Sequence, residues 1–241
     1  MKKLVFFVCF CLIMLCYVVA GAVFARADFD APEGFDPEEM SKGIPVATLM
    51  DNPYMTLINR QNRLSEDWTD YFTFDVGRNA LGEIFIVEHR ALAAFEALRK
   101  DLLENEGIQI ELDSVYRTHD DQVAIWNEWL ETEGYDYCMT YLAPPDCSEH
   151  QTGLAIDVFL IRNGEVIREN DDLFAASEEF AKVHEYLWRY GFILRYLEGK
   201  EEITGYGYEP WHFRYLGDAT IAEDIMTRGI TFEEYSAEIP A

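Results

Sequence analysis

The chain has few basic residues for its length. Among its 241 residues, 19 are lysine or arginine and 45 are aspartate or glutamate, which gives a net charge of −26. Phosphate backbones repel a polyanion of this size, so nucleic acid is excluded as an expected partner. We interpret the acidity itself as a solvated protein surface.

Cysteine is scarce outside the N-terminal segment. Three of the five cysteines lie in the apolar run of residues 4–25, where we interpret them as small hydrophobic side chains. Cys16 follows Leu15 rather than the small residue that precedes a lipidated cysteine, so a lipoprotein is not expected. Cys138 and Cys147 would close a short loop, and in an oxidising compartment such a pair is expected to form a disulfide. Two free thiols are the alternative.

Charged residues are absent from residues 4–25, which follow two lysines at positions 2 and 3. This pattern, followed by Ala-Arg-Ala at residues 25–27, resembles a secretory signal with its cleavage site before residue 28. The run is also long enough to span a bilayer, so an uncleaved membrane anchor is the alternative. Both interpretations of residues 1–27 place the domain outside the cytoplasm, with membrane contact through this segment alone.

The rest of the chain divides into a linker and one domain. Residues 28–44 are acidic, with prolines and glycines and little periodicity, which is typical of a linker. Residues 45–241 are long enough for a single well-cored domain. Hydrophobic residues make up 49% of the chain and aromatic residues 15%. We expect this domain to be globular and monomeric.

Periodicity within the domain predicts an interleaved set of helices and strands. Helices are expected over residues 85–106, after the capping-box-like pair Thr118 and Asp121, over residues 177–190, and from about residue 218. Strands are expected over residues 54–58, 108–112 and 154–161, and residues 134–146 have the composition of a loop. No regular βαβ repeat occurs, so the pattern favours an α+β fold with a small antiparallel sheet flanked by helices.

Two short segments about fifty residues apart carry the chemistry. Residues 148–157 read SEHQTGLAID, and residues 209–215 read EPWHFRY. Together they supply two imidazoles, one carboxylate that can act as a ligand and one spare carboxylate. A catalytic zinc site needs this set: three protein ligands, an open position for water and a general base beside it.

Local backbone chemistry indicates how these side chains would converge. Gly153, between His150 and Asp157, can adopt the positive φ that folds the chain back. The proline after Glu209 disfavours the α region there, so the arrangement differs from the helical HExxH motif. Across a turn, Glu209 would still approach His212. The three ligands would then be His150, Asp157 and His212, with Glu209 as the base.

The joint occurrence of the two segments resembles a known family. Ser-x-His-x-x-Gly-x-Ala-x-Asp at residues 148–157, joined to Glu-Pro-Trp-His-x-Arg-Tyr at residues 209–215, is similar to the VanY-type D-alanyl-D-alanine carboxypeptidases. These zinc peptidases are related to VanX-type dipeptidases and, more distantly, to lysostaphin-type endopeptidases and hedgehog N-terminal domains. The similarity extends over about residues 54–235, and it implies the hedgehog/D,D-peptidase-like α+β fold.

The resemblance also implies roles for individual residues. It makes His150, Asp157 and His212 the zinc ligands and Glu209 the catalytic carboxylate. The arginine that holds the substrate's terminal carboxylate in this family corresponds to Arg117. A guanidinium suits that task because its planar fork can donate two parallel hydrogen bonds to a carboxylate.

Two further positions correspond to residues that line the family's substrate pocket, namely Gln122 and Ser148. The expected activity is zinc-dependent removal of the terminal D-Ala from peptidoglycan stem peptides. An L,D-carboxypeptidase or a D-Ala-D-Ala dipeptidase shares these motifs and remains an alternative. A non-catalytic, zinc-containing module that binds the cell wall is the alternative from another class, although such a module would not need Glu209.

Overall fold

The computed structural model describes residues 52–65 and 68–239. The predicted signal or anchor (residues 1–27) and the predicted acidic linker (residues 28–44) lie outside these residues. Within the described part of the chain, no helix is both long and apolar enough to cross a membrane.

Helices and strands alternate along the described chain. The strands are β1 (Phe74–Arg78), β2 (Ile84–Glu88), β3 (Gln109–Ser114), β4 (Ala155–Arg162), β5 (Glu165–Ile167), β6 (Phe192–Leu194) and β7 (His212–Tyr215). The α-helices are α3 (His89–Glu106), α4 (His119–Thr132), α5 (Tyr135–Tyr141), α6 (Asn170–Ala175), α7 (Ser177–Leu187), α8 (Glu201–Thr204), α9 (Ala219–Arg228) and α10 (Phe232–Glu238). Short 3₁₀ helices are η1 (Pro53–Met55), η2 (Trp68–Tyr71), η3 (Glu149–Thr152) and η4 (Trp188–Tyr190).

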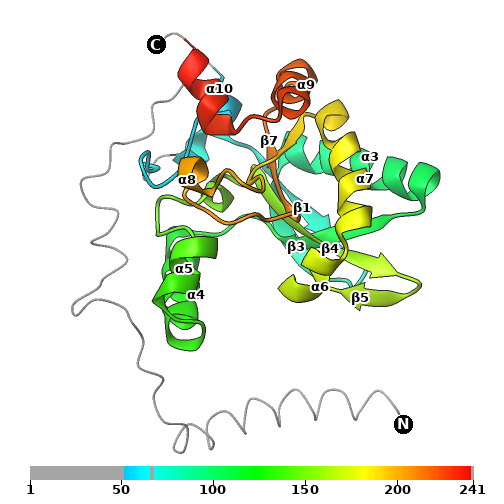
Figure 1. Ribbon diagram of the computed structural model, residues 1–241, viewed down its shortest axis with the longest axis horizontal. Helices are drawn as coiled ribbons and strands as arrows, with labels where there is room; N and C mark the ends of the chain where they lie inside the picture. The colour runs from blue at the N-terminus through cyan, green and yellow to red at the C-terminus, as the bar shows by residue number, and fades with distance from the viewer. Residues whose placement is uncertain (1–51, 66–67, 240–241) are drawn as a thin grey trace, which may run out of the picture.

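The strands form two antiparallel sheets. The larger sheet has the order β3-β4-β7-β6, with β5 paired to β4, and β1 and β2 form a separate hairpin. Helices α3 and α7 pack against each other beside the larger sheet, whereas α4 and α5 form a pair at the other end of the molecule (Figure 1). The predicted α+β class with a small antiparallel sheet flanked by helices is therefore confirmed.

The core lies between the larger sheet and the α3/α7 pair. On α3 the buried side chains recur at helical spacing, at Ala91, Phe95, Leu98 and Leu102. This helix ends at residue 106, as predicted, and Gly107 follows it with a φ of 69° in the left-handed region. The capping box predicted at Thr118 and Asp121 also forms, at the start of α4.

Three predicted elements differ from the structure. The helix expected over residues 85–106 begins only at position 89, because Ile84–Glu88 pairs with β1 as a strand. The strand expected over residues 54–58 is replaced in part by η1, at whose start the Asn52 side chain accepts a hydrogen bond from the Tyr54 amide. The segment 134–146, expected to be a loop, contains α5.

Gly153 is the point at which the chain turns from η3 into β4. Its φ is +71°, and a Cβ there would lie 2.8 Å from Phe74 Cε1 and 3.0 Å from the Glu88 amide nitrogen. We therefore expect Gly153→Ala to lower the free energy of unfolding by about 1–3 kcal/mol, because it combines backbone strain with a clash against the Phe74 ring and a tight contact with the Glu88 backbone.

Denaturant unfolding measures this loss, and Gly164→Ala is the matched control. Gly164 also has a positive φ, of +83°, but nothing lies within 4 Å of its Cβ position. Equal losses at the two positions would mean that the close approach at Gly153 contributes nothing.

Candidate active site

Strand pairing places two of the predicted ligands opposite each other. In the register between β4 and β7, Asp157 is the direct partner of His212. Directly paired residues of antiparallel strands have their side chains on the same face and close together. The Asp157 Oδ1 atom accordingly lies 2.8 Å from His212 Nδ1.

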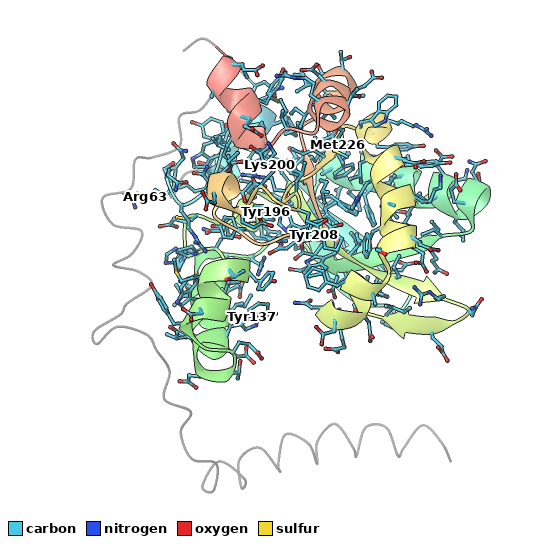
Figure 2. The ribbon with its side chains drawn as sticks, viewed as in Figure 1. Arg63, Tyr137, Tyr196, Lys200, Tyr208 and Met226 are labelled. Carbon is cyan, nitrogen blue, oxygen red and sulfur yellow. The ribbon has the colours of Figure 1, made fainter. Side chains whose placement is uncertain are left out.

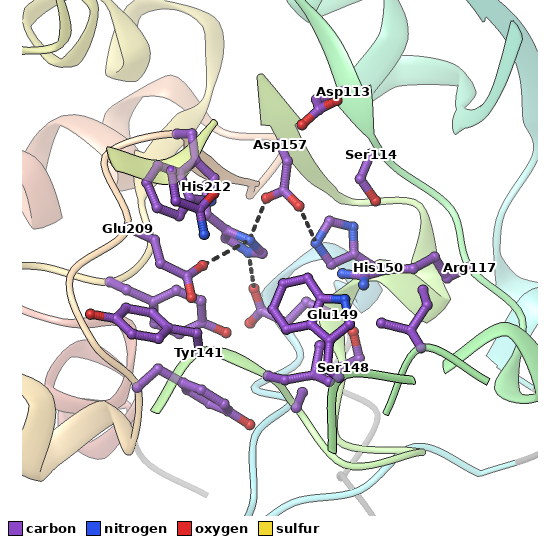
Figure 3. A pocket seen from close by; sticks show the side chains of 18 of the residues that line it. Asp113, Ser114, Arg117, Tyr141, Ser148, Glu149, His150, Asp157, Glu209 and His212 are labelled. Carbon is purple, nitrogen blue, oxygen red and sulfur yellow. Dashed lines mark ion pairs between the residues drawn. The ribbon is translucent and has the colours of Figure 1, made fainter. Parts of the chain in front are cut away.

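The third predicted ligand reaches the same point from η3. The Nδ1 atom of His150 is 2.6 Å from the Val115 carbonyl oxygen, which orients the ring. Its other nitrogen, Nε2, lies 3.2 Å from Asp157 Oδ2. The rings of His150 and His212 are 4.9 Å apart and nearly perpendicular. Figure 3 shows both imidazoles turned toward the Asp157 carboxylate.

These three side chains fit a divalent metal ion. One ligand atom from each of His150, Asp157 and His212 lies within 4.8 Å of the other two. The His150 Nε2 and Asp157 Oδ1 atoms are buried, and although each lies close to another ligand side chain, neither makes a well-oriented hydrogen bond within residues 52–65 and 68–239. Such atoms are costly to bury unless a ligand satisfies them. Two imidazoles and one carboxylate form a donor set used at catalytic zinc sites.

Electrostatics favours the protonation states that a metal ion needs. Burial, reinforced by the positive charge of Arg117, lowers the pKa of His150 to about 4. Burial alone would raise the pKa of Asp157, but the adjacent His150 and His212 hold it far below its ordinary value. A neutral imidazole and an ionised carboxylate are the forms that bind a metal ion.

The candidate general base lies next to the ligands. Glu209 and His212 are joined by the predicted turn, in which the His212 amide donates to the Glu209 carbonyl at 3.2 Å. The Glu209 Oε2 atom is 3.6 Å from His212 Nδ1. Burial and the negative charge of Asp157 raise the pKa of Glu209 well above its ordinary value. A cation bound beside Glu209 would counteract that shift.

The three residues predicted to bind substrate differ in position. Arg117 and Ser148 line the same cavity as the ligands, and Arg117 Nε is buried without a hydrogen-bond partner in the described chain. Gln122 does not line the cavity but lies behind its wall. Its Nε2 donates to the carbonyl oxygen of Ala143 at 2.7 Å, and Ala143 is a lining residue.

The cavity that contains the ligands has a volume of about 310 Å³. This volume is at the lower end of the range for small-molecule and peptide sites. In Figure 2, Tyr196 and Tyr208 lie centrally, between the α4/α5 pair and α7. Large apolar and aromatic side chains line the cavity beside its polar groups, namely Ile125, Trp129, Tyr141, Leu142, Leu173, Tyr196, Tyr206 and Trp211.

Residues 85–218 match the family described as VanY: D-alanyl-D-alanine carboxypeptidase. The chain belongs to the VanY family. The matched part contains the three ligands, Glu209 and Arg117, so the resemblance inferred from the two motifs is confirmed.

Individual relatives agree with this assignment. The VanY-family chain is 44% identical over 133 residues to the bifunctional D-Ala-D-Ala dipeptidase and D-Ala-D-Ala carboxypeptidase VanXYC of Enterococcus gallinarum. That alignment covers 52% of this chain and 65% of the relative's length. This chain is also 37% identical over 139 residues to the putative carboxypeptidase YodJ of Bacillus subtilis. That second alignment covers 58% of this chain and 50% of YodJ. The chain thus spans only part of these curated relatives.

Solved structures show the same fold. One is the vancomycin resistance D,D-pentapeptidase VanY from a VanB-type cassette, a mutant in complex with Zn(II). It has a TM-score of 0.61 and 30% identity, and the match covers 76% of this chain and 98% of that one. Another is the LD-carboxypeptidase LdcB, with a TM-score of 0.65 and 28% identity over 81% of this chain and 95% of that one.

Sequence reasoning assigned no role to two residues of this VanY-family site. Glu149 lies inside the first motif and lines the cavity, with its side chain fully buried. Tyr196 packs against the site at a tilt, with its ring centroid 4.8 Å from that of His212. The only available signal for Glu149 was its place between Ser148 and His150, because its partners are distant in sequence.

The disulfide predicted between Cys138 and Cys147 is not formed. Both side chains are buried as free thiols. Cys138 packs with Trp126 and Leu142 between α4 and α5, so it belongs to a separate apolar cluster. Burial raises the pKa of Cys138 to about 11 and that of Cys147 to about 12, which keeps both in the unreactive thiol form.

We therefore expect a reducing agent to leave the thermal unfolding midpoint of this VanY-family protein unchanged, within about 1 °C. Breaking a native disulfide would remove about 2–4 kcal/mol of stability and shift the midpoint by several degrees. Calorimetry with and without dithiothreitol measures the difference. A clear fall in the midpoint with the reductant would show that a disulfide forms in solution.

Proposed function

We propose that this protein is a zinc-dependent carboxypeptidase that removes the terminal D-Ala from peptidoglycan stem peptides ending in D-Ala-D-Ala. One observation carries the proposal. A single cavity contains three convergent metal donors, the carboxylate of Glu209 beside them and the guanidinium of Arg117. The VanY family and the dipeptidase and carboxypeptidase activities of the relative VanXYC support the same substrate class.

The residues divide the work of peptide hydrolysis between them. His150, Asp157 and His212 would hold the metal ion. When bound, zinc supplies Lewis-acid activation of the peptide carbonyl and of a water molecule. Glu209 takes a proton from the water as it adds to the carbonyl carbon. It then gives this proton to the departing amine when the C–N bond breaks.

Arg117 determines which bond is cut. A carboxypeptidase must recognise a free carboxylate one residue beyond the scissile bond. Arg117 lies in the cavity on the His150 side of the ligands, as Figure 3 shows. Its charge persists in spite of burial, because an arginine side chain remains protonated at any physiological pH. Ser148 lines the same region and can contribute a hydroxyl donor.

The N-terminal sequence supports an extracytoplasmic location for this activity. Residues 1–27 combine a positive start with an uncharged apolar run, so we propose that they export the domain or anchor it to the cell membrane. Either arrangement would bring the cavity to wall-linked stem peptides, rather than to a free dipeptide in the cytoplasm.

Release of D-Ala tests the proposal. The zinc-loaded protein is incubated with a muropeptide ending in D-Ala-D-Ala and, separately, with a tetrapeptide ending in one D-Ala, and mass spectrometry follows the products. We expect trimming of the first substrate, which a zinc chelator abolishes. Trimming of the tetrapeptide alone would instead assign the L,D-activity that the likeness to LdcB also allows. Zinc binding without release from either substrate would favour a non-catalytic wall-binding module.

A further inference from the structure

His212 faces different groups with its two ring nitrogens. Nδ1 lies 2.8 Å from Asp157 Oδ1 and 3.6 Å from Glu209 Oε2. Nε2 points away from both carboxylates, toward Glu149 Oε2 at 4.0 Å. Two donors on one tetrahedral zinc ion lie about 3.3 Å apart. Nδ1 is therefore the His212 atom placed to share a metal ion with Asp157, and Figure 3 shows Glu149 on the other side of the ring.

The Glu149 carboxylate is held rigidly in this position. Its side chain is fully buried, and its Oε1 lies 2.9 Å from Arg195 Nε and 2.8 Å from Arg214 Nη1. Burial alone would raise the pKa of Glu149, but the two arginines lower it below its ordinary value. Glu149 is therefore an anion. Two guanidinium groups contact its Oε1 and fix its position.

The arginines are themselves anchored. Arg195 donates from both terminal nitrogens to Glu233 on α10, at 2.7 and 2.8 Å. Arg214 Nη2 donates to the carbonyl oxygens of Tyr54 and Thr56. This network links α10 and the start of the described chain to the back of the metal site.

Two buried polar atoms lie between the Glu149–arginine network and the metal site without a hydrogen-bond partner among the described residues. Glu149 Oε2 and His212 Nε2 face each other, and neither has a hydrogen-bond partner in the described part of the chain. A shift of about 1 Å would bring them to hydrogen-bond distance. Hydrogen bonds around catalytic groups are often long in a ligand-free site and shorten when it is occupied.

We propose that Glu149 is a positioning residue that accepts the Nε2–H of His212, so that this histidine presents Nδ1 to the metal ion. A carboxylate on the second nitrogen of a ligating imidazole selects the tautomer and strengthens the ligand. The inference rests on the metal site of the proposed function but not on its substrate.

Two variants of the same charge network separate positioning from structural support. In Glu149→Gln the amide oxygen faces Arg195 and Arg214, since an NH₂ group cannot accept from them. The NH₂ group then points at His212 and favours the tautomer with a proton on Nδ1, which cannot bind zinc. Glu233→Gln also removes a partly buried carboxylate from the network, but it leaves Glu149 against His212.

Zinc affinity, measured by competition with a chromophoric chelator, tests the proposal. We expect Glu149→Gln to weaken zinc binding about 10- to 100-fold, and Glu233→Gln to weaken it less than about 3-fold while lowering the melting temperature. Glu202→Gln, an exposed change on α8, reports on general charge effects. Equal weakening by the first two variants, or none in Glu149→Gln, would overturn the positioning role.

Nitrogen-15 NMR of the zinc-loaded wild-type protein provides a second measurement that needs no variant to fold. We expect His212 to show zinc-bound Nδ1 and a slowly exchanging, hydrogen-bonded Nε2–H. Zinc on Nε2, or an Nε2–H that exchanges freely with water, would refute the inference. A wild-type protein that binds zinc in this way but releases no D-Ala would refute the proposed activity and leave the role of Glu149 intact.

Discussion

Replacing Glu209 with glutamine is expected to lower kcat on a D-Ala-D-Ala peptide by about 10²- to 10⁴-fold, which is the usual contribution of general acid–base catalysis. Glutamine has nearly the same shape as glutamate, but it cannot take a proton from the attacking water. The buried carboxylate of Glu209 lies 3.6 Å from His212 Nδ1, so the lost proton transfer is at the reacting centre. Because the three ligands are unchanged, zinc should stay bound at full stoichiometry.

Steady-state kinetics and metal analysis of the same sample measure both effects. Glu202→Gln is the matched control, since it makes the same chemical change at an exposed position on α8. If Glu209→Gln kept wild-type turnover, the proton would have to move through another group. If zinc were lost together with activity, Glu209 would be a ligand and not the base.

The metal ligands could be predicted from sequence because their spacing encodes local geometry. Gly153 lets the chain turn back between His150 and Asp157, and the proline after Glu209 excludes a helical arrangement there. The decisive contact, however, depends on β4 and β7 being paired with Asp157 opposite His212. Those strands are far apart in the chain, and only the family resemblance indicated that they meet.

The buried charge network behind the metal ligands could not be predicted from the sequence in the same way. Glu149 reaches Arg195 across 46 positions, and Arg195 reaches Glu233 across 38. Each of these residues alone has the sequence character of an ordinary surface charge. A charged side chain is buried only where its partners are already in place, and such partners are properties of the tertiary structure.

Local helical periodicity is also overridden where pairing between strands competes with it. Ile84–Glu88 continues the helical spacing of α3, yet it forms a strand because β1 offers it a hydrogen-bonding partner. The cysteine pair illustrates a similar limit. Ten residues from Cys138 to Cys147 permit a disulfide, but sequence spacing does not show where a side chain points, and Cys138 packs on Trp126.

Replacing Arg117 with alanine is the second change expected to have a large effect. Truncating one member of a buried, hydrogen-bonded charge pair costs about 2–5 kcal/mol, which corresponds to roughly 30- to 5,000-fold in kcat/KM. Arg117→Lys should recover only part of this loss. Lysine keeps the charge, but it lacks the planar fork that donates two parallel hydrogen bonds to a carboxylate.

A substrate change separates recognition of the carboxylate from other roles of Arg117. A peptide whose C-terminal carboxylate is converted to an amide should be a poor substrate for the wild-type enzyme. The same peptide should be nearly insensitive to Arg117→Ala, because the group that the arginine recognises is already gone. Arg162→Ala, an exposed change at the far end of β4, should alter neither rate. If Arg117→Ala slowed hydrolysis of the acid peptide and of the amide peptide equally, the guanidinium would support the structure of the cavity and would not recognise the substrate carboxylate. The nearby negative charges of Asp157 and Glu209 would then be its partners in place of the substrate.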